Sequence, residues 1–308
     1  MIPERPFSHP DVVIYHGGCP DGFAAAWVAH RRWPTACLRP QTHGRPWPSP
    51  SGYVLVVDIA PSTEKDWQRL RRHAHRLQVL DHHITLLRTA PAAPELVLNL
   101  DRSGVEMMWR LAFPDIEMPG PLRWIADRDC GRPLTPTAHA MLAVLDTLPH
   151  DHRAWSDWLR RATALDDVQK NRGHAILTRR RAWIAVQWRR ARPIRDGTHE
   201  GWGLFVPPRW LDLAAAQMDV AQPGSSRPSH RVFVRTHHRD RTGIWHLSWR
   251  PAPSASIDVE PLARRWGGGG HPHAAAARVR DVRCTRQGGI KVTPLPGSNR
   301  YDNKPWSG

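Results

Sequence analysis

The sequence predicts an α/β protein whose N-terminal domain is a parallel sheet with helices on both faces. Apolar runs typical of buried strands alternate with helical patterns in the first half of the chain, and this alternation favours parallel strands. The length of 308 residues exceeds what one core usually organises, so more than one domain is expected. We expect the parallel-sheet domain at 1–150, a helical connector at 151–195, a smaller α/β domain at 196–285 and a flexible tail at 286–308.

Four segments of the first half are expected to be strands, namely 12–17, 53–60, 77–83 and 95–100. The run YVLVVDIA at 53–60 is the clearest, because it is continuously apolar up to an acid. Helical patterns lie at 22–33, 103–112 and 121–129, and from a cap at Ser62 or Thr63 to Leu77, with Trp67, Leu70 and Ala74 on the same face as Leu77.

The second half begins with an arginine-rich helical pattern from about 151 to 192. Residues 231–236 and 243–249 are expected to be strands, 221–230 a loop and 261–266 a short helix that leads into GGGGHPHAAAA. These elements predict the smaller α/β domain.

Composition limits the class of protein. The chain is 40% hydrophobic and 23% charged, as in soluble globular proteins, and its net charge of +16 favours a polyanionic partner such as nucleic acid. No apolar run is long enough to span a membrane and the N-terminus lacks signal-peptide features, so we expect a cytoplasmic protein without a membrane partner.

The 16 tryptophans are expected mostly in the cores. The four cysteines lack C-x-x-C spacing, which argues against a zinc ribbon or a disulfide scaffold.

Acids and histidines follow three of the predicted strands. His16, Asp58 and the run Asp81–His83 each lie where a strand ends. Because the carboxyl ends of parallel strands meet at one edge of a sheet, where ligands bind, we expect these side chains to lie together.

The two adjacent histidines suggest a division of roles at this edge. Neighbouring side chains that leave a strand point to different sides, so His82 can ligate a metal while His83 faces the substrate, and Asp81 can orient a ring. Asp21 and an acid of IADRD would supply enough further ligands for two metals that share a carboxylate. Mixed His and carboxylate ligation favours Mn²⁺ or another borderline divalent ion.

The chain contains, in this order, HGGCPDGFAAA, VVDIA, DHH, IADRD, SWRP and GGGGHPHAAAA. Together, these motifs resemble the DHH phosphoesterase superfamily with its C-terminal DHHA1 domain, over residues 16 to about 279. The resemblance implies a hydrolase of the nano-RNase or oligoribonuclease type, related to single-strand DNA exonucleases. Such an enzyme cleaves phosphoric esters of short oligonucleotides or small nucleotides by attack of metal-activated hydroxide. An exopolyphosphatase-like enzyme and a catalytically impaired protein that binds single strands are the alternatives.

The same resemblance implies roles for individual residues. His16 and Asp58 would bind one metal, and Asp21, Asp58, His82 and an acid of IADRD the other, with Asp58 bridging. For that acid we expect Asp127, with Asp129 as the alternative. His83 would face the substrate phosphate, and Asp81 would support the cluster. The metals would be two Mn²⁺, with Mg²⁺, Co²⁺ or Zn²⁺ as other options.

Cys19 departs from the family pattern. It stands where the first of two aspartates is expected if the motif is aligned on Gly22 and Ala25; if it is aligned on Pro20, Phe23 replaces the second. As a ligand, Cys19 would be a softer donor and would favour Zn²⁺, Fe²⁺ or Co²⁺; otherwise, one metal would be held more weakly.

In the second domain, the expected substrate-binding residues are Arg250, Gly268, Gly269, Gly270 and His271. Glycines let backbone N–H groups approach an anion, and an arginine can bind a phosphate through two hydrogen bonds. The expected partner is a short single-stranded nucleic acid or a nucleotide, and a homodimer is left open.

Overall fold

The computed structural model describes residues 9–90, 93–196, 199–218, 232–239, 243–252, 255, 257–284 and 290–295. The chain divides into two compact units, Met1–Leu177 and Thr178–Gly308, here called the first and second units. Among the described residues, no helix is long and apolar enough to cross a membrane.

The first unit is built on a five-stranded parallel sheet, as expected, in the order β2-β1-β3-β4-β5. Its strands are β1 (Val12–His16), β2 (Cys37–Gln41), β3 (Gly52–Val57), β4 (Ala74–Asp81) and β5 (Leu96–Leu98). The strand β2 was not predicted. It is largely exposed and contains Pro40, which an edge strand tolerates because one side of the strand makes no sheet hydrogen bonds.

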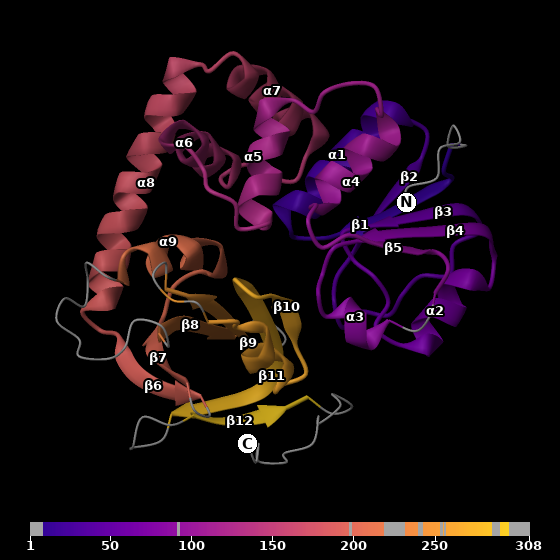
Figure 1. Cartoon of the computed structure of the whole chain (residues 1–308). Helices are drawn as coiled ribbons and strands as arrows, with labels where there is room; N and C mark the ends of the chain where they lie inside the picture. The colour runs from indigo at the N-terminus through magenta and orange to yellow at the C-terminus, as the bar shows by residue number, and fades with distance from the viewer. Residues whose placement is uncertain are drawn as a thin grey trace. The chain divides into compact units, whose positions relative to one another are not determined.

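Helices cover both faces of this sheet, as Figure 1 shows. The helices α1 (Pro20–Arg32) and α4 (Gly104–Ala112) pack on one face with Val13 and Leu55, and α5 (Gly120–Asp129), α6 (Pro136–Leu145) and α7 (His152–Thr163) extend the same core. On the opposite face, Ile14 and Val56 pack against α2 (Glu64–Arg71) and α3 (Leu86–Thr89). Neighbouring residues of β1 therefore serve different cores, as strand geometry requires.

The start of α2 was predicted correctly and its end was not. Thr63 caps the helix by accepting a hydrogen bond from the Asp66 N–H. The helix stops at Arg71, so Ala74 and Leu77 belong to β4 rather than to a helical face. Both residues still pack against the same core, so their apolar spacing fits either structure. The helix α6 was not predicted.

The second unit contains a mixed sheet in the order β10-β11-β9-β8-β7-β6, and β12 pairs with β11. The strands are β6 (Arg192–Asp196), β7 (His199–Leu204), β8 (Val232–Arg239), β9 (Trp245–Pro251), β10 (Gly269–His271), β11 (Ala274–Cys284) and β12 (Ile290–Pro294). The other elements are α9 (Leu211–Ala216), α11 (Glu260–Arg264) and a 3-10 turn at Pro208–Trp210.

The two strands and the short helix expected around 231–266 are confirmed as β8, β9 and α11, whereas β6, β7 and α9 were not predicted. Residues 290–294, expected in a flexible tail, form β12. The loop expected at 221–230 lies outside the described residues.

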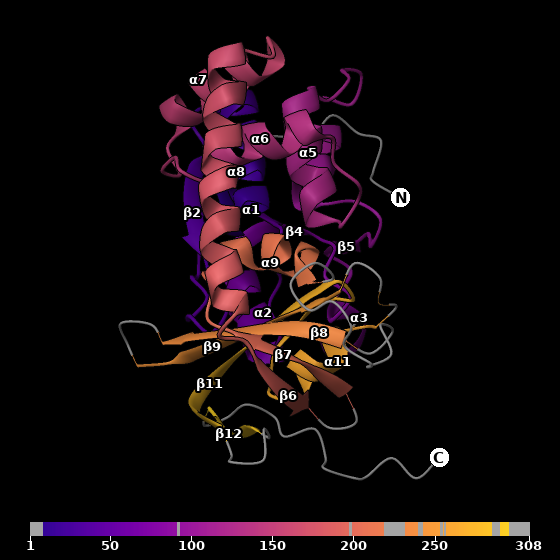
Figure 2. The same cartoon turned by 90° about the vertical axis from the view of Figure 1, so that its left-hand side faces the viewer.

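The arginine-rich helical pattern forms two helices, α7 and the long α8 (Asp167–Trp188), which leads into β6 (Figure 2). Trp155 and Trp158 of α7 are buried in the first core, whereas Trp188 is buried with Leu211 and Ala214 of the second unit. Most of the tryptophans among the described residues are buried in the cores, as expected.

Candidate metal centre

The polar residues that follow β1, β3 and β4 lie at one edge of the first sheet. Strand register places Tyr15 beside Val57, and Val57 beside Leu80. His16, Asp58 and Asp81, each one residue further along the chain, therefore emerge side by side. The strand order reverses between β1 and β3, which is where open parallel sheets bind ligands.

The carboxylate of Asp58 lies between two imidazoles. The Nε2 atom of His82 is 3.0 Å from Asp58 Oδ1, and the Nδ1 atom of His16 is 3.4 Å from Asp58 Oδ2. Asp58 and His82 are each 1% exposed. Each oxygen of one buried carboxylate is thus paired with a different histidine.

The backbone of Asp58 is in the left-handed region, with φ of 62°. This conformation is uncommon for residues other than glycine, although Asp and Asn tolerate it better than most. Glycines leave room for the side chain. A Cβ atom on Gly22 would lie 2.9 Å from Asp58 Oδ2, and one on Gly104 would lie 2.5 Å from the Asp58 Cβ. The first turns of α1 and α4 therefore pack directly on this aspartate.

Asp21 enters the site from the first turn of α1. Its Oδ1 atom accepts a hydrogen bond from the Val105 N–H of α4 at 3.3 Å, and its Oδ2 atom would lie 2.8 Å from a Cβ on Gly104. Asp21 forms a group with His82 and Asp129, in which one donor atom from each lies within 4.8 Å of the others. This group is the second set of possible metal ligands.

The two acids of IADRD have different surroundings. Asp129 Oδ2 is 3.3 Å from His82 Nε2, whereas Asp127 Oδ1 accepts a hydrogen bond from Arg132 Nε at 2.6 Å. Among the described residues, Asp127 belongs to none of the groups of possible ligands. The geometry therefore favours Asp129, the alternative, over Asp127 as the ligand. The two side chains are about 200° apart around the helix, so only one of them can face the site.

Cys19 lies at the N-cap position of α1, where no side-chain capping bond forms. It groups with His16 and Asp58, again with one donor atom from each within 4.8 Å. Burial raises the pKa of the Cys19 thiol well above its usual range, and the charges of Asp58 and Asp129 raise it further. A bound cation would be needed to favour the thiolate.

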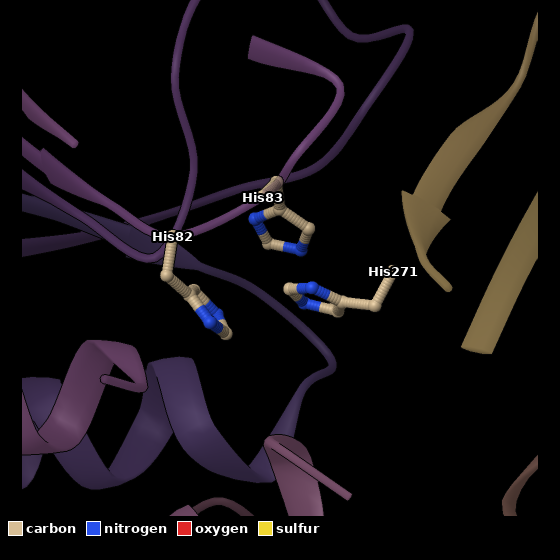
Figure 3. Close-up of side chains that lie close together, drawn as sticks. All are labelled: His82, His83 and His271. Carbon is tan, nitrogen blue, oxygen red and sulfur yellow. The ribbon is translucent and has the colours of Figure 1, made fainter. Parts of the chain in front are cut away.

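Asp81 holds the chain after β4 in place. Its Oδ1 atom accepts hydrogen bonds from the His82 N–H at 2.6 Å and the His83 N–H at 3.1 Å, and lies 2.7 Å from His83 Nδ1. Figure 3 shows the rings of His82 and His83 beside each other, with centroids 4.8 Å apart and planes tilted by 55°. Asp81 therefore orients the His83 ring.

Burial and neighbouring charges shift the pKa values of the carboxyl groups in opposite directions. Burial raises the pKa of Asp21 well above its usual range, and repulsion from Asp58 and Asp129 adds to this. Burial alone would also raise the pKa of Asp58, but hydrogen bonds and positive charge from His16 and His82 lower it far below its usual range. Three carboxylates thus compete for two imidazoles.

The donors fit two divalent cations. Asp21 Oδ2 is buried and makes no hydrogen bond with the described residues. Asp58 Oδ2 is also buried, and the atom beside it is His16 Nδ1 at 3.4 Å. Buried polar atoms normally have partners, so such atoms point to a missing ligand. One set, His16, Cys19 and Asp58, mixes nitrogen, sulfur and oxygen donors, and a second, Asp21, His82 and Asp129, has nitrogen and oxygen donors. A further group at this edge joins Asp58 and Asp81 to His82 and His83. Asp58 belongs to the first set, and its Oδ1 atom lies 3.0 Å from His82 of the second.

One further histidine at this edge was missed. The His43 ring lies 5.2 Å from the His16 ring and 6.3 Å from the His83 ring, measured between centroids. His43 follows β2 by two residues, so it belongs to the same edge of the sheet. The exposed, proline-containing β2 was not recognised as a strand, and the signal of a fourth strand end was lost with it.

The expected substrate-binding residues lie in the second unit. Arg250 of β9 donates a hydrogen bond from Nε to Asp212 and another from Nη1 to the Trp249 carbonyl at 2.9 Å. The ring of His271, also labelled in Figure 3, lies 5.4 Å from that of His273, between centroids. Arg250 is thus already bound to an acid.

The glycines before His271 have a packing role. A Cβ atom on Gly268 would lie 2.1 Å from the Ala276 carbonyl oxygen, and one on Gly270, whose φ is 140°, would lie 2.4 Å from that of Ala274. Gly269 pairs with Ala276 in the sheet. The GGGGH segment therefore needs small residues to form β10 against β11.

Gly104→Ala tests the packing of α4 on the acids. The new methyl group would collide with Asp58 and Asp21, so we expect the variant to lose about 1–3 kcal/mol of stability and to bind divalent metal more weakly. Urea unfolding in chelator and titration with Mn²⁺ would measure the two effects. The matched control is Gly120→Ala at the start of α5, where a Cβ would have no neighbour within 4 Å. Equal stability and affinity in both variants would contradict this packing.

No family model and no curated protein matches the sequence. Three solved structures are similar in outline. An uncharacterised protein from Helicobacter pylori G27 is 13% identical over 88% of this chain and 94% of its own, with a TM-score of 0.35. The pGpG-specific phosphodiesterase PggH from Vibrio cholerae is 12% identical over 87% of this chain and 92% of its own, with a TM-score of 0.44. RecJ from Thermus thermophilus, in complex with Mn²⁺, is 14% identical over 86% of this chain and 49% of its own, with a TM-score of 0.41. At such values, the function has to be inferred from the site's own residues.

Proposed function

We propose that the first unit is the catalytic unit of a two-metal phosphoesterase that hydrolyses short oligonucleotides or small nucleotides. One observation carries this proposal: the buried carboxylate of Asp58 belongs to the donor set of His16 and Cys19, and its Oδ1 atom lies 3.0 Å from Nε2 of His82, which belongs to the other set. A carboxylate shared in this way is the arrangement that two-metal hydrolytic centres need. Two divalent cations, when bound, would polarise a phosphoryl group and activate a water molecule for attack.

Within this centre, His16, Cys19 and Asp58 would hold one cation. Asp21, Asp58, His82 and Asp129 would hold the other. The crowding of buried carboxyl groups supports cation binding, because positive ions would offset both the burial of Asp21 and its repulsion from Asp58 and Asp129, which raise its pKa.

His83 is the candidate proton donor to the leaving oxygen. Its side chain is 19% exposed, and Asp81 lies 2.7 Å from its Nδ1 atom. Burial would lower the pKa of His83, but the charge and hydrogen bond of Asp81 raise it above its usual value. The imidazolium is thereby favoured, and its Nε2–H can donate to a phosphate or leaving oxygen.

The choice of substrate depends on charge. A net charge of +16 attracts polyanions, which supports nucleic acid or nucleotides over neutral substrates. Polyphosphate, the substrate of the alternative enzyme, satisfies the same electrostatic condition. A chain that binds single strands without hydrolysing them is the remaining alternative.

Hydrolysis of 5′-labelled dinucleotides in the presence of Mn²⁺ tests the proposal. We expect turnover that chelator abolishes and that His82→Asn lowers by more than about 100-fold, because the substitution removes a ligand of the second set. The control is His75→Asn, at an exposed position of the same strand, which should retain full activity. Polyphosphate is assayed in parallel. Hydrolysis of polyphosphate alone would assign the alternative enzyme, and binding of single strands without turnover would exclude catalysis.

Metal preference tests the role of Cys19. With a thiolate ligand, the protein should take up Zn²⁺ or Co²⁺ in preference to Mn²⁺ at the His16 set, and Cys19→Asp should shift this preference towards Mn²⁺. Metal analysis after loading with an equimolar mixture would measure the ratio, and a thiolate-to-cobalt absorption band should disappear in the variant. Cys37→Ser, at an exposed position of β2, is the control. If Cys19→Asp changes neither the ratio nor the band, Cys19 is not a ligand.

A further inference from the structure

Arg132 connects three segments around the candidate metal centre. Its Nε atom donates to Asp127 Oδ1 at 2.6 Å, its Nη2 atom to Glu106 Oε2 at 2.8 Å and its Nη1 atom to the Asp101 carbonyl at 3.1 Å. The two carboxylates are 21% and 19% exposed and the Arg132 side chain is 35% exposed, so these ion pairs are partly shielded from water. Arginine suits this position because its planar guanidinium offers donors in fixed directions.

The turn that ends α5 fixes the position of Arg132. Cys130 is the C-cap residue, and Gly131 follows it in the left-handed conformation with φ of 68°. The Arg132 N–H then donates to the Asp127 carbonyl at 2.7 Å, which completes a Schellman turn. The backbone and the side chain of Arg132 are therefore both bound to Asp127.

The other partner, Glu106, organises the first turn of α4. Its Oε2 atom also accepts a hydrogen bond from the Ser103 N–H at 3.0 Å, and Ser103 Oγ accepts from the Glu106 N–H in a capping box. The same turn contains Gly104 and Val105, which pack on Asp58 and donate to Asp21. Arg132 therefore binds the turn whose neighbouring residues contact Asp58 and Asp21.

On α5, the ion pair and the candidate ligand lie on different sides of the helix. Asp127 faces Arg132, and Asp129 lies 3.3 Å from His82. Two residues along an α-helix correspond to a rotation of about 200°. The face of α5 that Arg132 fixes is therefore roughly opposite the face that presents Asp129.

We propose that Arg132 is a positioning residue of the metal centre, which sets the separation of α4 and α5 so that Asp21 and Asp129 act as one donor set. The inference rests on the proposed function. Loss of Arg132 would leave every ligand in the chain but would let the two helices move relative to each other. The expected defect is therefore weaker metal binding, with the chemistry unchanged once metal is bound.

Titration of the full-length chain with Mn²⁺, by calorimetry, tests this role. We expect Arg132→Gln to weaken Mn²⁺ binding about 10–100-fold, as loss of residues that orient metal ligands commonly does. Turnover of dinucleotides should fall at limiting Mn²⁺ and recover at excess Mn²⁺. Arg132→Lys should lie between wild type and Arg132→Gln, because one ammonium group cannot reproduce the fork.

Arg128→Gln is the matched control, because it removes an ion pair from the same last turn of α5. Arg128 Nη1 donates to Asp146 Oδ1 at 2.9 Å. We expect both Gln variants to lower the unfolding midpoint in chelator, and only Arg132→Gln to change Mn²⁺ affinity. Equal affinity losses in the two variants, or wild-type affinity in Arg132→Gln and Arg132→Lys, would overturn the proposal.

A double substitution tests whether Arg132 acts through its ion pair with Glu106. If Arg132 acts through Glu106, the affinity loss of the double variant Glu106→Gln/Arg132→Gln should be close to that of either single variant rather than their product. Multiplicative losses would contradict this route. A wild-type chain that binds neither Mn²⁺, Zn²⁺ nor Co²⁺ would overturn the proposed function as well, whereas wild-type binding that Arg132 does not influence overturns the positioning role alone.

Discussion

The candidate site depends on one buried interaction, the placement of the Asp58 carboxylate between His16 and His82. A buried carboxylate is strongly destabilising unless it is paired, and here each oxygen has its own imidazole. The pairing holds the pKa of Asp58 far below its usual range despite burial, so the charge persists in the interior. The left-handed backbone that directs this side chain is uncommon outside glycine and is typical of residues held in place for function.

The surrounding elements serve this carboxylate. Parallel strands bring His16 and His82 to its two sides, and the first turns of α1 and α4 pack on it where glycines allow a close approach. The last turn of α5 adds Asp129. The cost of this arrangement is the burial of several carboxyl groups close together. Burial raises the pKa of Asp21, and repulsion from Asp58 and Asp129 raises it further. Burial, strain and the crowding of carboxyl groups therefore support the same chemistry.

Much of this site could be predicted from the sequence, because strand ends are visible in apolar runs. His16, Asp58 and Asp81–His83 each follow such a run, and parallel strands bring their ends together. The choice between Asp127 and Asp129 was not predictable in this way. It depends on how α5 is rotated against its neighbours, and Arg132, which binds Asp127, lies beyond the motif.

The elements that were missed carry weak local signals. The strand β2 is short, exposed and interrupted by proline, so neither it nor His43 was recognised. The glycines at 268 and 270 pack closely on the backbone of β11, a contact that the glycine-rich motif did not indicate. Contacts of this kind join distant segments, so they produce no periodic pattern of apolar residues in the sequence.

The most direct test of the central claim is the number of Mn²⁺ ions bound by the wild-type chain and by Asp58→Asn, measured by equilibrium dialysis. Asn tolerates the left-handed backbone at this position, so the variant should fold while losing the shared charge. Two ions per chain in the wild type and weak or absent binding at both positions in the variant are predicted. Two ions bound with unchanged affinity in Asp58→Asn would contradict the account.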